Sequence, residues 1–391
     1  MESIVIVGAK RTPIGALQGK FNAVTAPQLG ATAIKAAVEQ AGVKSNEVED
    51  VIFGCVLPAA QGQAPARQAA IYAGLDKTTP ATTVNKMCGS GMKAAMMAFD
   101  ELSAGQAKVI VAGGMESMTN APFMLPKARA GYKYGAQQLL DHMATDGLED
   151  AYVGKPMGFF ADKTAEKYGI TREEMDAFSK ESTTRALNAE KSGAFADEIA
   201  PVTVKTRAGE EVVKQDETPF TVKIEKIPTL RPAFNKDGRV TAATSSSISD
   251  GAAALVMMTE SEAKRRGAKP LARILAYASN AHEPEWFTTA PVGAIQKVLA
   301  KAGWKASDVD LFEINEAFAV VTMAAMKDVG IPYEKVNVNG GAVALGHPIG
   351  ATGARIITTL IYALRKRGLK KGVAALCIGG GEATAVALEV L

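Results

Sequence analysis

The rarest reactive side chains of this sequence are three cysteines and three histidines, so each can be judged in its own surroundings. Cys88 precedes Gly-Ser-Gly and the apolar stretch 92–99, which has the composition of a buried helix. A thiol at a helix N-terminus lies near the positive end of the helix dipole, which stabilises the reactive thiolate. Cys88 is therefore a candidate nucleophile, with a buried structural cysteine as the equally weighted alternative.

Three further side chains lie in turn-forming surroundings that could fix them for chemistry. His347 lies in a loop with five glycines, whereas His142 and His282 lie in polar segments that suggest surface or supporting roles. Cys377 ends an apolar strand before a glycine turn. Asn315 lies between an expected strand and an expected helix, where capping the helix is the alternative role.

Several kinds of binding site are disfavoured by spacing and charge. No two Cys or His residues have the spacing of a metal site, which argues against a metal hydrolase and predicts no bound metal. Gly89, Gly91 and Ala94 match a dinucleotide-binding pattern only loosely, because no acidic residue is suitably placed after the next strand. With 44 basic and 41 acidic residues, the net charge of +3 argues against nucleic-acid or anionic-membrane partners.

The elements that must position these residues follow an alternating pattern. Apolar segments at 3–7, 51–53 and 109–112 alternate with helical patterns at 26–41 and 91–104. This alternation predicts a mixed or mostly parallel sheet covered by helices. The helix at 91–104 is apolar on nearly every face, which predicts a buried central position.

The ends of the chain resemble one another. Three segments recur at an almost constant offset: 41–54 with 302–315, 91–94 with 353–356, and 109–114 with 375–380. We therefore predict a first half at 1–118, rejoined by 244–269, and a related second half at 270–391. The intervening residues 119–243 are richer in charged residues, Pro and Tyr, and predict a loop-rich insertion that handles the substrate.

The chain length and the cysteine pattern restrict the class of protein. A length of 391 residues suits two or three compact units. The cysteines are odd in number and widely spaced, which favours a reducing compartment. The first residues show no leader pattern and the apolar runs are strand-sized, so we expect a cytoplasmic protein, or the mature form of an organelle-matrix protein, with no membrane partner.

Four motifs in series resemble the signature motifs of the thiolase family. In chain order they are Cys88-Gly-Ser-Gly, Asn315-Glu-Ala-Phe, Gly346-His-Pro and Cys377-x-Gly379. The resemblance runs from the first expected strand to the last, and segments 113–118 and 287–291 are most similar to the short-chain members that act on acetoacetyl-CoA. It implies a thiolase-like α/β fold, a duplicated and layered α-β-α-β-α core with an inserted loop domain.

The resemblance also implies roles for the motif residues. Cys88 would take up an acyl group from a CoA thioester, His347 would activate it, and Cys377 would be a second acid/base. One oxyanion site would use His347 and a water held by Asn315, and the other the backbone N–H groups of Cys88 and Gly379. The implied reaction is a reversible ping-pong Claisen condensation of two acetyl-CoA into acetoacetyl-CoA and CoA through acetyl-Cys88. Such an acyltransferase of fatty acid metabolism needs no cofactor, because the CoA thioesters are its substrates.

Further positions match residues that bind the substrate in thiolases. Ser246 matches a serine near the pantetheine arm, and the residues that match the lining of the pocket are Leu148, Met157, Phe234, Phe287, Ala317 and Phe318. Pro156 stands where many short-chain members have histidine, which leaves the preferred acyl-chain length open. Segment 124–136 resembles the tetramerisation loop of the family, so we expect a homotetramer or a homodimer.

Three alternatives compete with this interpretation. A degradative 3-ketoacyl-CoA thiolase of broader or longer chain length is the nearest one. A decarboxylating ketoacyl synthase typically carries one active-site cysteine with two histidines or a histidine and an asparagine, whereas here Cys377 lies in a second motif. A non-catalytic acyl-CoA-binding or lipid-transfer protein would have lost a catalytic motif residue, and all four motifs are complete.

Overall fold

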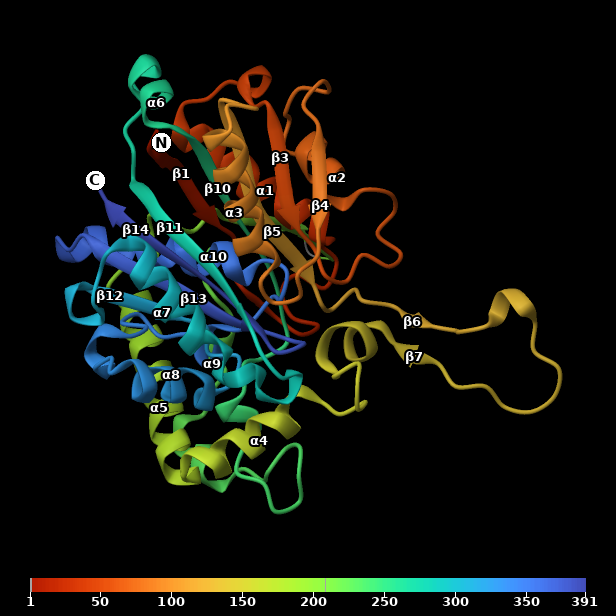
Figure 1. Ribbon diagram of the computed structural model, residues 1–391. Helices are drawn as coiled ribbons and strands as arrows, with labels where there is room; N and C mark the ends of the chain where they lie inside the picture. Colours follow the sequence, from red (N-terminus) through yellow and green to blue (C-terminus); the bar gives the residue numbers. More distant parts are fainter. Residues whose placement is uncertain (1, 208) are drawn as a thin grey trace.

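The structure is a computed structural model, and it describes residues 2–207 and 209–391 of the protein. Met1, the first residue of the predicted first half, and Ala208, in the predicted insertion, lie outside the described residues. The described chain forms five layers in the order helix, sheet, helix, sheet, helix, with additional segments at one end (Figure 1). The predicted layered α/β fold is confirmed.

The main sheet repeats one strand order in its two halves. The order is β4-β3-β5-β10-β1 in the first half and β12-β13-β14-β11 in the second, and antiparallel pairing of β1 with β11 joins them. Val336 forms a parallel bridge with Phe312 of β12, at the position that β4 has beside β3. The strands are β1 (Ile4–Arg11), β2 (Gly15–Ala16), β3 (Asp50–Gly54), β4 (Ala81–Val84), β5 (Val109–Ser117), β10 (Ser249–Thr259), β11 (Ala272–Ala281), β12 (Leu311–Ile314), β13 (Lys371–Ile378) and β14 (Glu382–Val390).

Helices cover both faces of each half of the sheet. α1 and α2 pack on the outer face of the first half, α7 and α8 on the outer face of the second, and α3 and α10 lie between the halves (Figure 1). The core helices are α1 (Ala26–Ala41), α2 (Pro65–Tyr72), α3 (Ser90–Ser103), α6 (Glu260–Arg266), α7 (Ala290–Ala302), α8 (Ala319–Val329), α9 (Ala342–Leu345) and α10 (Thr352–Arg367). Within the described residues, no helix has the length and apolar composition needed to cross a membrane.

Local sequence explains where these helices begin and end. At the start of α1 the Gln28 side chain accepts a hydrogen bond from the Thr25 N–H at 2.9 Å, and Pro27 occupies the first turn. The helix ends at Gly42, whose φ of 65° is left-handed and therefore favours glycine. The predicted helix at 26–41 is confirmed, and the apolar helix predicted at 91–104 is α3, buried between the halves of the sheet.

The segment between β5 and β10 contains α4 (Met157–Tyr168), α5 (Arg172–Lys191), the short pair β6 (Phe123–Met124) and β7 (Leu140–Asp141), and the hairpin of β8 (Val202–Thr206) and β9 (Gly209–Val213). The β6–β7 arm projects away from the body (Figure 1). A buried ion-pair cluster fastens this segment to the core. Arg11 of β1 donates to Glu198 at 2.5 Å and to Asp216 at 2.7 Å, and all three side chains are fully buried. Because unpaired buried charges are costly, this cluster fixes how the segment is seated.

The two central helices approach one another through glycines. A Cβ atom on Gly353, near the N-terminus of α10, would lie 2.2 Å from the backbone nitrogen of Met92 on α3. A Cβ atom on Gly91 would lie 2.9 Å from the backbone nitrogen of Ala354. Gly91 and Gly353 are corresponding positions of the sequence repeat, so the repeat brings the same small residue to both sides of this contact.

We predict that Gly353→Ala lowers the free energy of unfolding by at least about 3 kcal/mol, because α3 and α10 must separate to admit the methyl group. The matched control is Gly105→Ala, just beyond the end of α3, where φ is 69° and a Cβ atom meets no described atom within 4 Å. That control costs only left-handed backbone strain, about 1–2 kcal/mol. Denaturant unfolding measures both variants, and equal losses would contradict the tight contact.

Candidate active site

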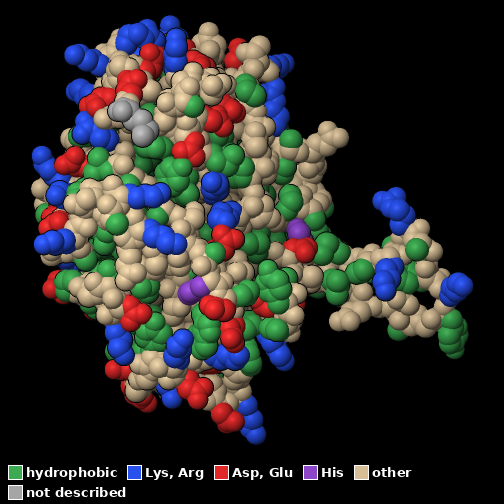
Figure 2. Space-filling view, viewed as in Figure 1, with side chains coloured by type: hydrophobic (Ala, Val, Ile, Leu, Met, Phe, Trp, Pro, Cys, Tyr) green, Lys and Arg blue, Asp and Glu red, His purple; other side chains and the backbone are tan. Residues whose placement is uncertain are grey.

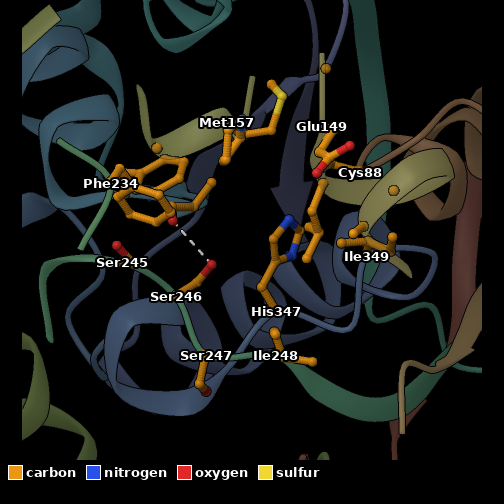
Figure 3. A pocket seen from close by; sticks show the side chains of 18 of the residues that line it. Cys88, Glu149, Met157, Phe234, Ser245, Ser246, Ser247, Ile248, His347 and Ile349 are labelled. Carbon is orange, nitrogen blue, oxygen red and sulfur yellow. Dashed lines mark hydrogen bonds between the residues drawn. The ribbon is translucent and has the colours of Figure 1, made fainter. Parts of the chain in front are cut away.

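A cavity of about 510 Å³ opens where the ends of the core strands meet the inserted segment. The sequence-predicted residues that line it are Cys88, Leu148, Met157, Phe234, Ser246, Phe287, Ala317, Phe318, His347, Cys377 and Gly379. Asn315 lies behind this surface, within 3.4 Å of the His347 ring. Figure 3 shows Cys88 and His347 on one side of the cavity and Phe234 on the other. The structure therefore gathers every residue that the sequence nominated for the site.

Cys88 lies in a tight turn between β4 and α3. Met87 directly before it has a φ of 46°, a left-handed conformation that is rare outside glycine and is common at functional sites. Ser90 braces the turn, because its hydroxyl donates to the Met87 carbonyl at 2.7 Å and accepts from the Lys86 N–H at 2.8 Å. The local backbone thus presents the thiol at a defined point of the cavity wall.

The structure corrects one expectation about Cys88. Burial raises the pKa of its thiol to about 11, although the N–H of Gly379 and its own N–H hydrogen-bond the sulfur and oppose the rise. The nearby charge of Glu116 raises the pKa further. The prediction that the helix N-terminus stabilises a thiolate is therefore wrong, because desolvation of the anion outweighs the stabilisation by the N–H groups.

His347 is held in one tautomer by the turn that follows it. Its Nδ1 lies 2.6 Å from Thr352 Oγ1, and that hydroxyl donates its own proton to the Pro348 carbonyl at 2.9 Å. Thr352 must therefore accept from an Nδ1–H, which leaves Nε2 unprotonated and facing the cavity. Burial, together with the positive charge of Arg355, lowers the pKa of His347 to about 3, so the imidazole is neutral at physiological pH.

Asn315 is placed by the end of β12. Its N–H donates to the Ala375 carbonyl at 2.9 Å, and its Nδ2 points to His347 Nε2 at 3.4 Å. The alternative capping role is wrong, since the N-cap of α8 is Phe318. The Oδ1 atom is buried and has no hydrogen-bond partner among the described residues. Such an oxygen is suited to hold a polar group inside the cavity.

Cys377 is the next-to-last residue of β13, and Gly379 begins the turn that joins β13 and β14. Cys377 is fully buried, and burial together with the neighbouring Cys88 raises the pKa of its thiol well above its usual value. Two thiols and one imidazole therefore meet at the cavity, all of them neutral. Three neutral groups of this kind can exchange protons only as bonds to the substrate form and break.

The wall opposite the thiols is apolar. The rings of Phe234 and Phe287 each pack edge-on against Phe318, at centroid distances of 5.9 and 6.3 Å. Met157 and Pro156 at the start of α4 continue this surface. The Ser246 hydroxyl donates to the Ala317 carbonyl at 3.0 Å, an interaction drawn in Figure 3. This wall suits a thioester chain more than a charged ligand.

Two buried side chains that support the site, Glu116 and Thr352, were not assigned a role from the sequence. The Glu116 carboxyl accepts hydrogen bonds from the N–H groups of Val56 and Gly350 at 2.9 Å and of Leu57 at 3.1 Å. It therefore ties β5 to the loop that follows His347. An acidic residue inside an otherwise apolar strand was the available signal for Glu116. Thr352 has no such signal, because only the fold brings it to the imidazole.

Other sequence candidates have supporting positions. His142 is buried and its Nδ1 contacts Asp146 at 2.7 Å, while His282 Nε2 contacts the Trp286 carbonyl at 2.8 Å. Within residues 2–207 and 209–391, no group of three or more His, Cys, Asp or Glu residues is arranged to hold a metal ion.

Comparisons with known proteins agree with this geometry. Residues 4–261 match the family model described as the thiolase N-terminal domain, and residues 268–390 match that of the thiolase C-terminal domain. A probable acetyl-CoA acetyltransferase of Dictyostelium discoideum is 50% identical over 392 residues, covering 100% of this chain and 95% of the relative. An acetyl-CoA acetyltransferase of Rhizobium meliloti is 50% identical over 390 residues, covering 100% and 99%.

A solved structure is similar over the whole chain. The crystal structure of the Bacillus anthracis acetyl-CoA acetyltransferase superposes with a TM-score of 0.98 at 43% identity, covering 100% of this chain and 99% of the other. Together, the two matching domain models, these full-length relatives and the shared fold show that the chain belongs to the thiolase family.

Proposed function

We propose that this thiolase is an acetyl-CoA acetyltransferase, which condenses two acetyl-CoA molecules reversibly into acetoacetyl-CoA and CoA. The observation that carries the proposal is the meeting of Cys88, Cys377, His347 and Asn315, from four separate motifs, in one cavity with an apolar wall. The names of the relatives that match over their full length support the same activity. No cofactor is required, because the thioester itself activates the acyl group.

The first half-reaction acetylates Cys88. Its sulfur attacks the carbonyl carbon of acetyl-CoA while its proton moves to His347 Nε2, which the hydrogen bond from Nδ1–H to Thr352 keeps unprotonated. The developing oxyanion is stabilised by the Cys88 and Gly379 N–H groups, one of the two predicted oxyanion sites. The CoA sulfur leaves with the proton of Cys377, so His347 ends as imidazolium and Cys377 as thiolate.

The second half-reaction forms the carbon–carbon bond. The Cys377 thiolate removes a proton from the methyl carbon of a second acetyl-CoA, and the enolate attacks the acetyl carbonyl on Cys88. The Cys88 sulfur then leaves and recovers its proton from His347. All three groups return to their neutral resting forms, which agrees with the direction of their pKa shifts in the buried site. Thiolysis is the same sequence reversed.

A degradative thiolase that accepts longer 3-ketoacyl-CoA is the second candidate. Pro156 lines the cavity beside Met157 and makes that part of the wall apolar, which favours contact with an acyl chain. The two candidates share every catalytic step and differ only in the length of chain that the wall admits.

We further propose that the enzyme works as a homotetramer or homodimer in a reducing compartment, the cytoplasm or an organelle matrix, in fatty acid metabolism. The β6–β7 arm supports self-association, because it projects from the body (Figure 2) and exposes large apolar side chains, namely Phe123, Leu125, Tyr134 and Leu139. Three free thiols support the compartment. Acidic and basic side chains are intermixed on the visible face, which gives no support to a nucleic-acid partner.

We predict that acetyl-CoA labels Cys88 and that Cys88→Ala lowers both condensation and thiolysis at least about 10³-fold, because no other group can carry the acetyl intermediate. Peptide mass spectrometry locates the label. Cys55→Ala is the matched control, since Cys55 is a buried thiol outside the cavity lining, and it should keep the label on Cys88. Labelling mainly on Cys55 in the wild type would contradict the proposal.

We predict that Cys377→Ala still forms acetyl-Cys88 slowly but loses at least about 10³-fold in condensation and thiolysis, because the α-proton has no other base. Intact-mass measurement after acetyl-CoA treatment follows the first step, and the change in acetoacetyl-CoA absorbance follows the complete reaction. A variant that condenses within about tenfold of the wild-type rate would exclude Cys377 as the base.

We predict that thiolysis of acetoacetyl-CoA has a higher kcat/KM than thiolysis of any 3-ketoacyl-CoA of eight to sixteen carbons. The aromatic wall of Phe234, Phe287 and Phe318 limits the space beyond a short acyl group. A kinetic series over chain length measures this preference. A higher kcat/KM for the long-chain thioesters would favour the degradative alternative.

A further inference from the structure

A buried ion pair lies directly behind the proposed catalytic groups. Arg355 is on α10 and Glu313 is on β12, and Arg355 Nη1 donates to Glu313 Oε1 at 2.9 Å. Their side chains are only 2% and 3% exposed. The remaining guanidinium donors, Nε and Nη2, have no partner among the described residues. The contact with Glu313 is therefore what fixes the guanidinium in place.

One end of this pair leads to His347. Thr352, the first residue of α10, contacts His347 Nδ1 at 2.6 Å, and Arg355 follows it by three residues. Residues three apart lie on the same face of a helix and move with it. The position of α10, which Arg355 anchors, therefore sets the position of the imidazole.

The other end leads to Asn315. Glu313 and Asn315 are two residues apart. The hydrogen bonding between β12 and β13 extends to Asn315, whose N–H donates to the Ala375 carbonyl at 2.9 Å. Side chains two apart in an extended strand lie on the same face. The position of the end of β12, which Glu313 anchors, therefore sets the position of the Asn315 amide.

We propose that the buried contact between Arg355 and Glu313 is a positioning device for the reaction, holding the His347 side of the site against the Asn315 side. The inference rests on the proposed acetyl-transfer function, in which His347 and a water held by Asn315 form one oxyanion site. The 3.4 Å approach of Asn315 Nδ2 to His347 Nε2 is then a consequence of how α10 is fastened to β12. A displacement of about 1 Å between such groups can cost about 100-fold in rate.

The pair has a second effect, on the charge of His347. The titratable groups near the imidazole are Arg355 on α10, Glu313 and Glu316 at the end of β12, Cys88 before α3, Cys377 on β13 and Glu116 on β5, which contacts the Gly350 N–H. Burial raises the pKa of Glu313 to about 8, although the charge of Arg355 opposes the rise. The thiols are neutral, and Arg355 is the charge that lowers the pKa of His347. Removal of Arg355 should raise that pKa, whereas removal of Glu313 leaves a positive charge unpaired and should not.

The kinetic test compares four variants in acetoacetyl-CoA thiolysis. Arg355→Met and Glu313→Leu remove the contact and should lower kcat about 10- to 100-fold with KM within about threefold of wild type. Glu313→Gln keeps an oxygen that accepts from Arg355 and should retain kcat within about threefold. Thr358→Val is the matched control, because Thr358 is a buried polar residue of α10 whose hydroxyl donates to the Ala354 carbonyl of the same helix at 3.0 Å, and kcat should be unchanged.

The charge test does not depend on activity. With three histidines in the chain, 15N-histidine NMR resolves each ring, and His347→Asn assigns the signal of interest. Wild-type His347 should show a protonated Nδ1 and should be mainly neutral at pH 4, because burial lowers its pKa to about 3. In Arg355→Met the titration midpoint should rise by at least about one pH unit, so that about half of the rings or more are protonated at pH 4, and in Glu313→Leu it should not rise. General damage to the site would move both variants in the same direction.

The outcomes separate this inference from the proposed function. If the wild-type protein shows no thiolysis, the proposed function is wrong. The NMR comparison would still show whether the pair controls the pKa of His347. If the wild-type protein is active and folded Glu313→Leu and Arg355→Met both have a kcat within about twofold of the wild-type value, the inference is overturned. An unmoved His347 titration in Arg355→Met would overturn its electrostatic part. Where Arg355→Met fails to fold, the comparison of Glu313→Leu with Glu313→Gln decides the positioning role.

Discussion

The contact between α3 and α10 at Gly91 and Gly353 is the constraint on which the rest of the structure depends. The two helices approach so closely only because neither carries a Cβ atom there. Each helix is preceded by a loop with one of the proposed catalytic groups, Cys88 before α3 and His347 before α10. The duplicated α/β halves therefore deliver a thiol and an imidazole to one cavity from the two sides of this close helix contact.

Burial then determines the protonation states of the site. It raises the pKa of Cys88 to about 11 and lowers that of His347 to about 3, so both groups rest neutral at physiological pH. In the proposed mechanism, the side chains are charged between the two half-reactions only as the imidazolium of His347 and the thiolate of Cys377, and both are discharged when the product forms. A site that holds no resting charge does not depend on solvent to stabilise its groups, which suits an apolar cavity for thioesters.

Buried polar contacts also fix segments that lie outside the two central helices. Arg11 fixes the inserted segment through Glu198 and Asp216, and Glu116 fixes the loop after His347 through three backbone N–H groups. Removing one partner would leave an unsatisfied group in the interior, so each contact has a strongly preferred geometry. The inserted segment and the loops around the cavity are therefore fastened to the core at defined points.

The sequence by itself determined the thiolase motifs and the helix at 26–41, because these depend on residues close in the chain, and the resemblance that the motifs carry implied the layered fold. It also nominated the residues that the fold gathers into one cavity. Only the tertiary structure decided that Cys88 rests as a thiol, that Asn315 faces His347 instead of capping α8, and that Arg355 meets Glu313. Desolvation and contacts between residues far apart in the chain exist only after folding, and no local pattern contains them.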